Sequence, residues 1–488
     1  MENNTLGNTL QPKEKKQKYN KAVNDSTLTS KHISIWVLAG MGIFIDGFDL
    51  FIIGIAMPLL LIQYPILKSN PTLVGFLSAA APIGAIFGAS ILGRLTDVKG
   101  RKFVLMLNLF FFVTFSILGA CSWNIWALFI FRFFIGVGIG GEYPVSSSYI
   151  SETIPKKYRK KILIGNFLFQ SLGAVFAALF GLLILFFFPY PNMWRIMLLA
   201  TSIMAIILFF FRLRLPESPK WLAQHGHRKK AGKQLSKIVG KKVKVSKVKD
   251  KHGEFKDIFK PQYIKLTILS CVPWFLMDIA MYGIGLFTPI IMATLFVSSS
   301  NHMDYIHHDM ASIRNSLVTD VFLVVGILLA LVLITRIGII RMQIMGFIGM
   351  GVGMMVIVLT VTFMKLGAPG YLPLVFGGFI VFYLFVNLGP NPMTYLLPAR
   401  IYPQHLRATG HGFASAMAKV GAAVGILFLP IFNQWIGLSN TLLIMAVLSF
   451  IGAIITLIFS LQIIKDKKNR KNYKRLVEDL EELVHHKI

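Results

Sequence analysis

Polar residues that could do chemistry lie inside some of the most apolar stretches of this chain. The segment WFLMDIAMYG places Trp274, Asp278 and Tyr282 at positions i, i+4 and i+8, within a run that is too apolar for a loop. On a helix these three side chains share roughly one face. A carboxylate in hydrocarbon costs roughly 2.5–3.5 kcal/mol on insertion scales, so Asp278 is a candidate functional residue.

A second charge, Lys419, lies in another apolar run, ASAMAKVGAAVG. Two opposite charges from two helices cost less together than apart, and an ammonium group offers three donors to an oxyanion. Asp278 is an acceptor, so it suits an anion that brings its own hydroxyl groups, such as monobasic phosphate but not sulfate. Its protonation can also couple binding to pH. A structural salt bridge between Asp278 and Lys419, with no substrate role, is the alternative.

The first half of the chain adds three carboxylates and an amide in apolar segments. FIDGFDLF puts Asp46 and Asp49 three residues apart, and GEYP puts Glu142 beside Tyr143. The two aspartates share one face of a helix. Glu142 is a functional candidate because of its depth in the membrane, with a satisfied structural pair as the alternative. Gln170, in GNFLFQSLG, either binds substrate or joins two helices by hydrogen bonds.

About twelve apolar helices must position these residues. Of the 488 residues, 55% are hydrophobic, which is more than a soluble protein of this length would have. Runs of about 20 apolar residues can cross a bilayer as helices. The predicted fold is an all-α membrane protein with twelve transmembrane helices in two six-helix lobes. The runs lie near 34–64, 72–95, 103–122, 124–150, 162–188, 194–213, 263–297, 316–335, 342–364, 371–397, 408–434 and 438–463.

The tenth run contains NLGPNPMTY, in which Pro390 and Pro392 are expected to break the helix. The backbone groups that a proline frees are tolerated in a membrane only where protein or a cavity satisfies them. Asn391, between the two prolines, is therefore expected to face a central cavity.

The formal net charge of +29 follows the topology. Lysines and arginines crowd the two tails and every second connection, while turns such as GACSWNIW and FFFPYPNMW are nearly free of them. This is the positive-inside pattern, and it predicts a multi-pass protein of the plasma (inner) membrane with both termini in the cytoplasm. The charge then attracts anionic lipid, and no nucleic-acid partner is expected. A basic tail that binds nucleic acid is the alternative.

A basic stretch divides the chain into two halves of six helices, which is the layout of a two-lobed transporter with its site near the midplane. We find no nucleophile–base pair, nucleotide loop or metal set, so no enzyme activity, cofactor or metal is expected. The stretch NHMDYIHHDM, with His302, His307 and His308, is expected to be a solvated loop of open role. The expected divisions are an N-terminal cytoplasmic tail 1–33, a lobe 34–214, a cytoplasmic linker 215–262, a lobe 263–464 and a C-terminal cytoplasmic tail 465–488.

Several motifs resemble those of a known family. GRLTDVKGRK, with Gly93, Asp97, Gly100 and Arg101, is similar to the signature loop of the major facilitator superfamily, and FRFFIGVGIGGEYPVSSSYISETIP and PESPKWL support that likeness. GPNPMTYLLPARIYPQHLRATGHGFASAMAKVGA and the WxxxDxxxY spacing resemble the phosphate:proton symporter branch. The likeness covers nearly the whole chain. Glu142 departs from the aspartate that is usual in this branch.

The resemblance implies the major facilitator fold, alternating access and roles for particular residues. The signature loop would latch the cytoplasmic gate, and one helix-1 aspartate would transfer protons, with Asp46 favoured and Asp49 alternatively a packing or gating residue. The proton-coupling residues implied are Asp46, Asp49 and Glu142. The substrate-binding residues implied are Tyr143, Gln170, Trp274, Asp278, Tyr282, Asn391 and Lys419.

The function implied is proton-coupled import of a small anion, inorganic phosphate above all, by a carrier that works as a monomer in the bilayer. A proton symporter for an aromatic or sugar acid, or for a sugar, is the nearest alternative on the same fold. An oxyanion site around Lys419 argues against a neutral sugar. A receptor or scaffold that does not transport is a different class, and the convergence of polar residues at midplane depth argues against it.

Overall fold

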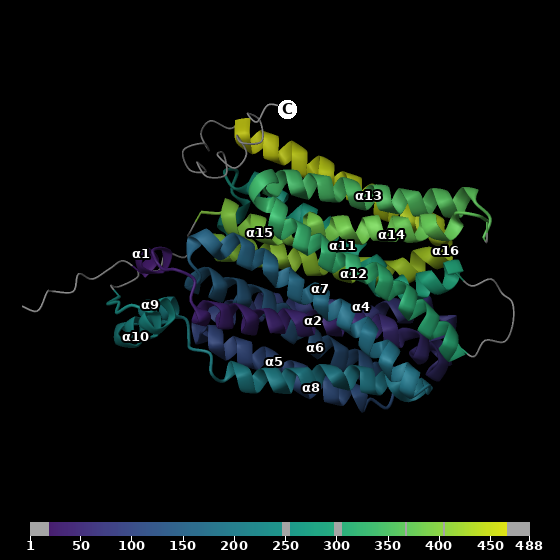
Figure 1. Ribbon diagram of the computed structural model, residues 1–488, viewed down its shortest axis with the longest axis horizontal. Helices are drawn as coiled ribbons and strands as arrows, with labels where there is room; N and C mark the ends of the chain where they lie inside the picture. The colour runs from purple at the N-terminus through teal and green to yellow at the C-terminus, as the bar shows by residue number, and fades with distance from the viewer. Residues whose placement is uncertain (1–18, 246–253, 297–304, 367, 404–405, 466–488) are drawn as a thin grey trace, which may run out of the picture.

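The computed structural model describes residues 19–245, 254–296, 305–366, 368–403 and 406–465, and the regular elements in these ranges are all helices (Figure 1). Eleven helical segments of the described residues are long and apolar enough to cross a membrane. The helices lie nearly side by side along the long axis of the molecule (Figure 1). The all-α prediction is confirmed.

The N-terminal lobe contains six long helices, close to the predicted runs. Three of them follow a residue whose side chain accepts a hydrogen bond from a backbone N–H of the first turn. Asn124 accepts a hydrogen bond from the Ala127 N–H (2.8 Å) at the start of one helix, and Gly100, with φ of 102°, makes the sharp turn between two others. The six are α2 (Ser30–Gln63), α4 (Pro71–Lys99), α5 (Arg101–Ala120), α6 (Ile125–Thr153), α7 (Lys156–Phe187) and α8 (Trp194–Arg212).

The C-terminal lobe is built from α11 (Ile264–Phe296), α12 (Tyr305–Ile337), α13 (Ile339–Phe363), α14 (Tyr371–Leu388), α15 (Pro390–Ile401) and α16 (Arg407–Lys465). The tenth span is broken as predicted. α14 ends at Leu388 with Gly389 as its C-cap, and α15 begins with Pro390 at its first position, where the missing N–H of proline costs nothing.

The last segment, α16, is two membrane spans. As one straight helix its 59 residues would reach roughly 88 Å, nearly three times the hydrocarbon core of a bilayer. The backbone leaves the helical conformation at Gly437, where φ is 80°. Before this point α16 packs on α11, and after it Ser439 and Thr456 bond Thr362 and Gln343 of α13 in antiparallel order. The chain therefore reverses at Gly437, and the described residues contain twelve spans, as predicted.

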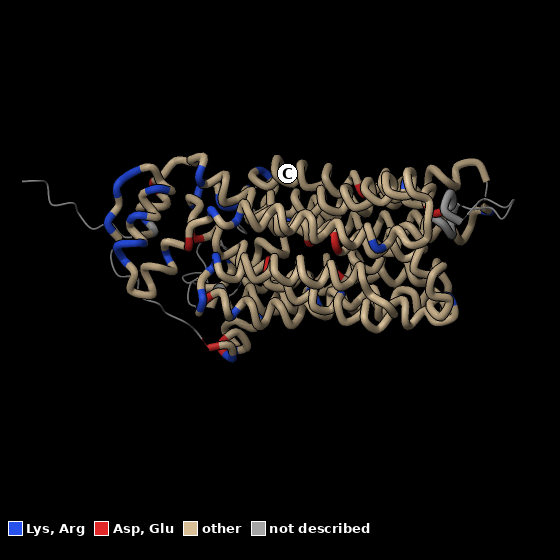
Figure 2. The backbone as a smooth tube through the Cα atoms, turned by 90° about the horizontal axis from the view of Figure 1, so that it is seen from below, with Lys and Arg blue, Asp and Glu red and all other residues tan. Residues whose placement is uncertain are grey.

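One end of the bundle carries most of the lysines and arginines (Figure 2), and we call it the basic end. Here α1 (Tyr19–Asn24), α9 (Pro219–Gln224) and α10 (Arg228–Val239) pack together around a small apolar cluster. The Tyr19 hydroxyl donates to the backbone oxygen of Glu152 (2.7 Å) and ties this cluster to α6.

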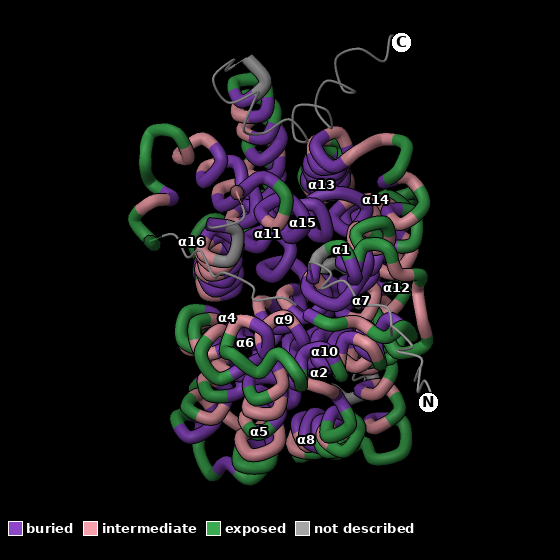
Figure 3. Tube along the Cα trace, turned by 90° about the vertical axis from the view of Figure 1, so that its left-hand side faces the viewer, coloured by how far each residue is buried: buried purple, intermediate pink, exposed green. Residues whose placement is uncertain are grey.

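The linker expected at 215–262 is divided between the lobes. Its first part, with α9 and α10, packs on the N-terminal lobe, whereas the short helix η2 (Phe255–Phe259) packs on Phe413 of the C-terminal lobe. Figure 3 looks onto the basic end and shows α9 and α10 over the N-terminal lobe. The C-terminal tail predicted at 465–488 lies beyond Lys465 and outside the described residues.

The loop predicted around His302, His307 and His308 falls on residues whose side chains lie outside the described part of the chain. The start of α12 differs from the prediction. The helix begins at Tyr305 rather than near 316, and Asp309, which was expected in a solvated loop, is buried. Asp309, Ser312, Ser316 and Asp320 recur on one face of α12, and all four are buried. These polar residues interrupt the apolar pattern, so apolar runs alone predict too late a start for α12.

Candidate functional site

Residues of both lobes meet at the centre of the bundle. The Gln170 amide of α7 donates to the Tyr143 hydroxyl of α6 (2.9 Å) and to the Tyr282 hydroxyl of α11 (2.7 Å). The ammonium of Lys419, from α16, lies 4.4 Å from the ring centre of Tyr143 and 5.1 Å from that of Tyr282. These four predicted residues therefore form one constellation, and the interhelical role and the substrate role of Gln170 are compatible.

Two carboxylates flank Lys419 without pairing to it. Asp46 and Asp278 are both electrostatic neighbours of the ammonium and are almost completely buried. Among the described residues, neither lies within the 4.0 Å of a salt bridge to Lys419. Both oxygens of Asp46 are also without a hydrogen-bond partner in this part of the chain. The simple Asp278–Lys419 salt bridge is therefore not what the structure contains.

Glu142 lies outside this constellation. Its carboxylate forms a buried ion pair with Arg212 of α8, and it also accepts a hydrogen bond from the Asn108 amide (2.9 Å). Arg212 donates in addition to the backbone oxygen of Leu38 (3.0 Å). Of the two interpretations left open for Glu142, the geometry is that of the satisfied structural pair, because its acceptors are occupied.

Asp49 is paired in the same way. The Arg132 guanidinium donates to one carboxylate oxygen (2.6 Å), and the Thr201 hydroxyl donates to the other (3.2 Å). All three side chains are buried inside the N-terminal lobe. Asp46 and Asp49 thus share a helix face but differ in surroundings, and only Asp46 reaches the Lys419 constellation.

Aromatic rings separate the constellation from the basic end. Trp274 lies edge-on to Tyr395 (centroids 6.1 Å apart) and to His411 (6.0 Å), and Tyr395 also contacts Phe167 (5.1 Å). The His411 ring bonds the backbone oxygen of Tyr395 (3.1 Å). All four rings are buried, and they form a layer between the Lys419 constellation and the basic end.

Asn391 has a hydrogen-bonded neighbour in the broken tenth span. Its amide donates to the side-chain oxygen of Asn387 (2.7 Å), and Asn387 donates to the Ser171 hydroxyl of α7 (2.8 Å). Asn391 is buried, and this chain of amides connects the helix break to the opposite lobe.

The end of the bundle opposite the basic end is closed by direct backbone contact between the lobes. A side chain on Gly54 of α2 would collide with the backbone oxygen of Leu286 in α11, and one on Gly75 of α4 with that of Leu427 in α16. Only glycine permits such approaches. Together with the aromatic layer, these contacts leave the central residues at most 5% exposed, so the site is occluded.

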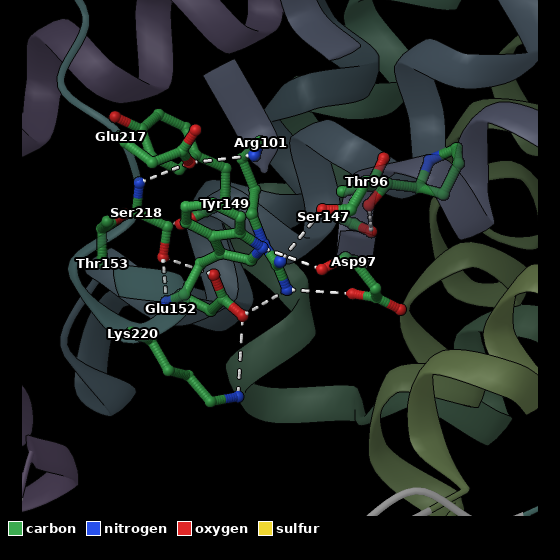
Figure 4. A network of polar contacts seen from close by, with 12 residues as sticks. Thr96, Asp97, Arg101, Ser147, Tyr149, Glu152, Thr153, Glu217, Ser218 and Lys220 are labelled. Carbon is green, nitrogen blue, oxygen red and sulfur yellow. Dashed lines mark hydrogen bonds and ion pairs between the residues drawn. The ribbon is translucent and has the colours of Figure 1, made fainter. Parts of the chain in front are cut away.

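The predicted gate loop is part of a dense polar network at the basic end (Figure 4). Arg101 donates to Asp97 (3.1 Å) and to Glu152 (2.9 Å). Glu152 also accepts a hydrogen bond from the Ser218 hydroxyl (2.6 Å). The loop thus binds the end of α6 and the start of α9, both in the N-terminal half of the chain.

Gly100 has a specific reason to be glycine, because its φ of 102° is strained for other residues and a Cβ would collide with the Glu217 carboxylate. Glu217 accepts from the backbone N–H of Arg101 (2.9 Å). Burial raises the pKa of the Glu217 carboxyl, an effect that its N–H donors oppose. Gly93 differs, since a Cβ there would make ordinary contact with Pro144 at 3.6 Å.

The sequence identified most of the candidate site residues, but not the residues that pair with them. Arg132 lay in FRFFIG and Glu152 in SETIP, both quoted as motifs, but nothing in a single sequence says which carboxylate meets which guanidinium. The remaining omissions are one residue of the N-terminal lobe, Arg212, and four of the C-terminal lobe: Asp320, Asn387, Tyr395 and His411.

A two-lobed bundle of twelve spans with a buried, occluded polar site between the lobes defines a membrane transporter of the alternating-access class. Residues 35–462 match the family described as sugar (and other) transporter. The chain therefore belongs to this transporter family of the major facilitator superfamily, and it is not an enzyme.

Two plant proteins are among its relatives. The chain is 30% identical to "Probable inorganic phosphate transporter 1-6" of Arabidopsis thaliana, over 87% of this chain and 90% of the relative. It is also 30% identical to "Inorganic phosphate transporter 1-2" of Oryza sativa subsp. japonica, over 88% and 91%.

Among solved structures, the xylose transporter XylE from E. coli in a partially occluded inward-open conformation matches with a TM-score of 0.71. The match covers 88% of this chain and 99% of the other at 20% identity. At that identity the likeness concerns the fold, which is the major facilitator fold predicted.

Proposed function

We propose that this protein is a proton-coupled symporter that imports inorganic phosphate. One observation carries the proposal: the Lys419 ammonium lies against the rings of Tyr143 and Tyr282, both hydroxyls are hydrogen-bonded to Gln170, and the Asp278 carboxylate is an electrostatic neighbour of the same ammonium. The names of the plant relatives support phosphate over the alternatives. The xylose transporter supports only the fold.

The donors and the acceptor suit monobasic phosphate. Lys419 supplies a positive charge for the anion, and the hydroxyl and amide donors bond its remaining oxygens. Asp278 accepts from a hydroxyl of the phosphate, which a fully deprotonated oxyanion could not offer. Binding would break the Gln170–Tyr282 hydrogen bond and replace it with bonds to the anion, so the anion would come to bridge the two lobes.

Proton coupling follows from the charges around this point. With Asp46 and Asp278 both ionised, the buried site has one positive and two negative charges, which repels an anion. A proton on Asp46 removes one negative charge, so the anion binds more tightly after the proton. We assign this role to Asp46 because it lacks an arginine, whereas Asp49 and Glu142 hold their helices together through Arg132 and Arg212.

The proposed function also requires an orientation in the membrane and a gate on the cytoplasmic side. We place the basic end in the cytoplasm, with both termini there, and the carrier in the plasma membrane as a monomer. Trp274 and Asn391 line the cytoplasmic side of the anion. The loop from Gly93 to Arg101 latches the cytoplasmic gate by holding the network around Glu152 in its closed arrangement.

The test is uptake of labelled phosphate into proteoliposomes with an inward proton gradient. Lys419→Ala removes the positive charge that attracts the anion, and Asp278→Asn removes the acceptor for its hydroxyl, so each should lower uptake about 100-fold or more. Lys365→Ala, at an exposed lysine remote from the centre, is the control and should match the parent. Uptake of organic acids or sugars but not phosphate by the parent would keep the fold and replace the substrate.

A further inference from the structure

A third buried carboxylate near the lobe interface has no place in the site described above. Asp320 of α12 is 4% exposed, and one of its oxygens lacks a hydrogen-bond partner within the described residues. A carboxylate at this depth in a membrane protein is costly, so it is a functional candidate by default.

Within the described residues, Asp320 has the Tyr383 hydroxyl, and no cation, as its electrostatic neighbour. α7, α11, α13 and α14 pack against α12. α14 brings the Tyr383 hydroxyl into the electrostatic reach of Asp320, and no charged side chain of the described residues acts on the carboxylate. The Tyr383 hydroxyl is in turn hydrogen-bonded to the Thr288 hydroxyl of α11. An ionised Asp320 would therefore be uncompensated, while a protonated one is a neutral acid among hydroxyls.

This cluster lies on the side of the site away from the basic end. Thr288 is six residues beyond Tyr282 on α11, which is about 9 Å along the helix axis. A Cβ on Gly285, between them, would approach both the Tyr383 hydroxyl (3.8 Å) and the Phe51 ring of α2 (3.3 Å). The cluster thus sits beside a contact between the lobes, which must separate when this end of the carrier opens.

We propose that Asp320, with the hydroxyls of Tyr383 and Thr288, is a second proton-binding site that carries one of the protons moved with each anion. The inference rests on the function proposed above. When the opposite end opens, Asp320 takes a proton from that side, and occlusion buries it as the neutral acid. Opening at the basic end then releases the proton to the other side.

A second proton site changes the net charge that the carrier moves with each phosphate. One proton moved with one monobasic phosphate carries no net charge, so the membrane potential cannot drive that step. A second proton gives the loaded carrier one net positive charge, and an inside-negative potential then pulls it inward. Asp46 would account for the first proton and Asp320 for the second.

The experiment compares the parent with Asp320→Asn in proteoliposomes that contain valinomycin. A potassium gradient of about tenfold, directed outward, should raise phosphate accumulation by the parent about tenfold if one net charge moves. Asp320→Asn should lose this response but keep uptake driven by a pH gradient. It should also keep gradient-free phosphate counterflow, which reports a folded carrier. Asp320→Glu should restore the response.

Asp309→Asn provides a matched control, since Asp309 is equally buried on the same face of α12. It should respond to the potential as the parent does. An unchanged response in Asp320→Asn, or loss of its counterflow, would overturn the second proton site. So would an equal loss in Asp309→Asn or a requirement for sodium in the parent. A parent that moves no phosphate would instead overturn the function proposed above.

Discussion

Inside the N-terminal lobe, Asp49 and Glu142 each meet an arginine, at 2.6 Å for the Arg132 pair. At the lobe interface, Asp46 and Asp320 have no cation within salt-bridge distance among the described residues. Both groups are equally buried, so depth in the protein does not separate them. What separates them is whether the charge is fixed by a partner that moves with the same lobe.

The difference suggests that the paired and the unpaired carboxylates have separate roles. A carboxylate locked to a guanidinium joins two helices and stiffens a lobe that must rotate as one body. A carboxylate at the interface can exchange a proton because its surroundings change when the lobes move. The comparison makes opposite predictions for stability and transport in the two regions.

The largest effect is expected from breaking a paired carboxylate. Arg132→Ala leaves the buried Asp49 carboxylate without its guanidinium partner, which should cost about 3–5 kcal/mol of stability. The measurement is the thermal unfolding midpoint of the purified protein in detergent, together with its yield. The double variant Arg132→Ala/Asp49→Ala should recover part of the loss, because it removes the orphaned charge. Equal stability of Arg132→Ala and the parent would refute the structural role.

A change at the unpaired carboxylate should act on coupling instead. Asp46→Asn removes a titratable group that has no arginine ion pair to lose, so the unfolding midpoint should stay within about 2 °C of the parent. Uptake driven by a proton gradient should fall about 100-fold, whereas phosphate counterflow without a gradient should persist. Asp49→Asn is the comparison, and it should lose stability first. Gradient-driven uptake that survives in Asp46→Asn would show that a group other than Asp46 carries the proton.

The smallest effect is expected at Gln170, which is hydrogen-bonded to one residue of each lobe. Gln170→Leu removes the two hydrogen bonds to Tyr143 and Tyr282 but no charge, at about 1 kcal/mol each. The KM for phosphate should rise about tenfold, with a similar maximal rate. Gln170→Asn, which keeps the amide on a shorter side chain, should fall between. A KM equal to that of the parent would show that Gln170 serves only to join the helices.

Much of this arrangement was predictable from the sequence, because apolar runs of membrane length and the spacing of Trp274, Asp278 and Tyr282 are local features. The partners were not predictable in the same way. Glu142 and Arg212 are 70 residues apart, and only packing brings them together. α12 was predicted eleven residues too short because the buried face with Asp309 and Asp320 is polar, so a search for apolar runs passes over it.

The reversal at Gly437 also has a mechanical consequence. One residue leaves the helical conformation between the last two spans, so the connection has no slack. The two spans are therefore joined without a flexible loop, with Lys419 on one span and the contacts to α13 on the other. We expect a displacement of α13 to be passed through this short connection to the span that carries the ammonium group. Inserting a few flexible residues at Gly437 should weaken this coupling.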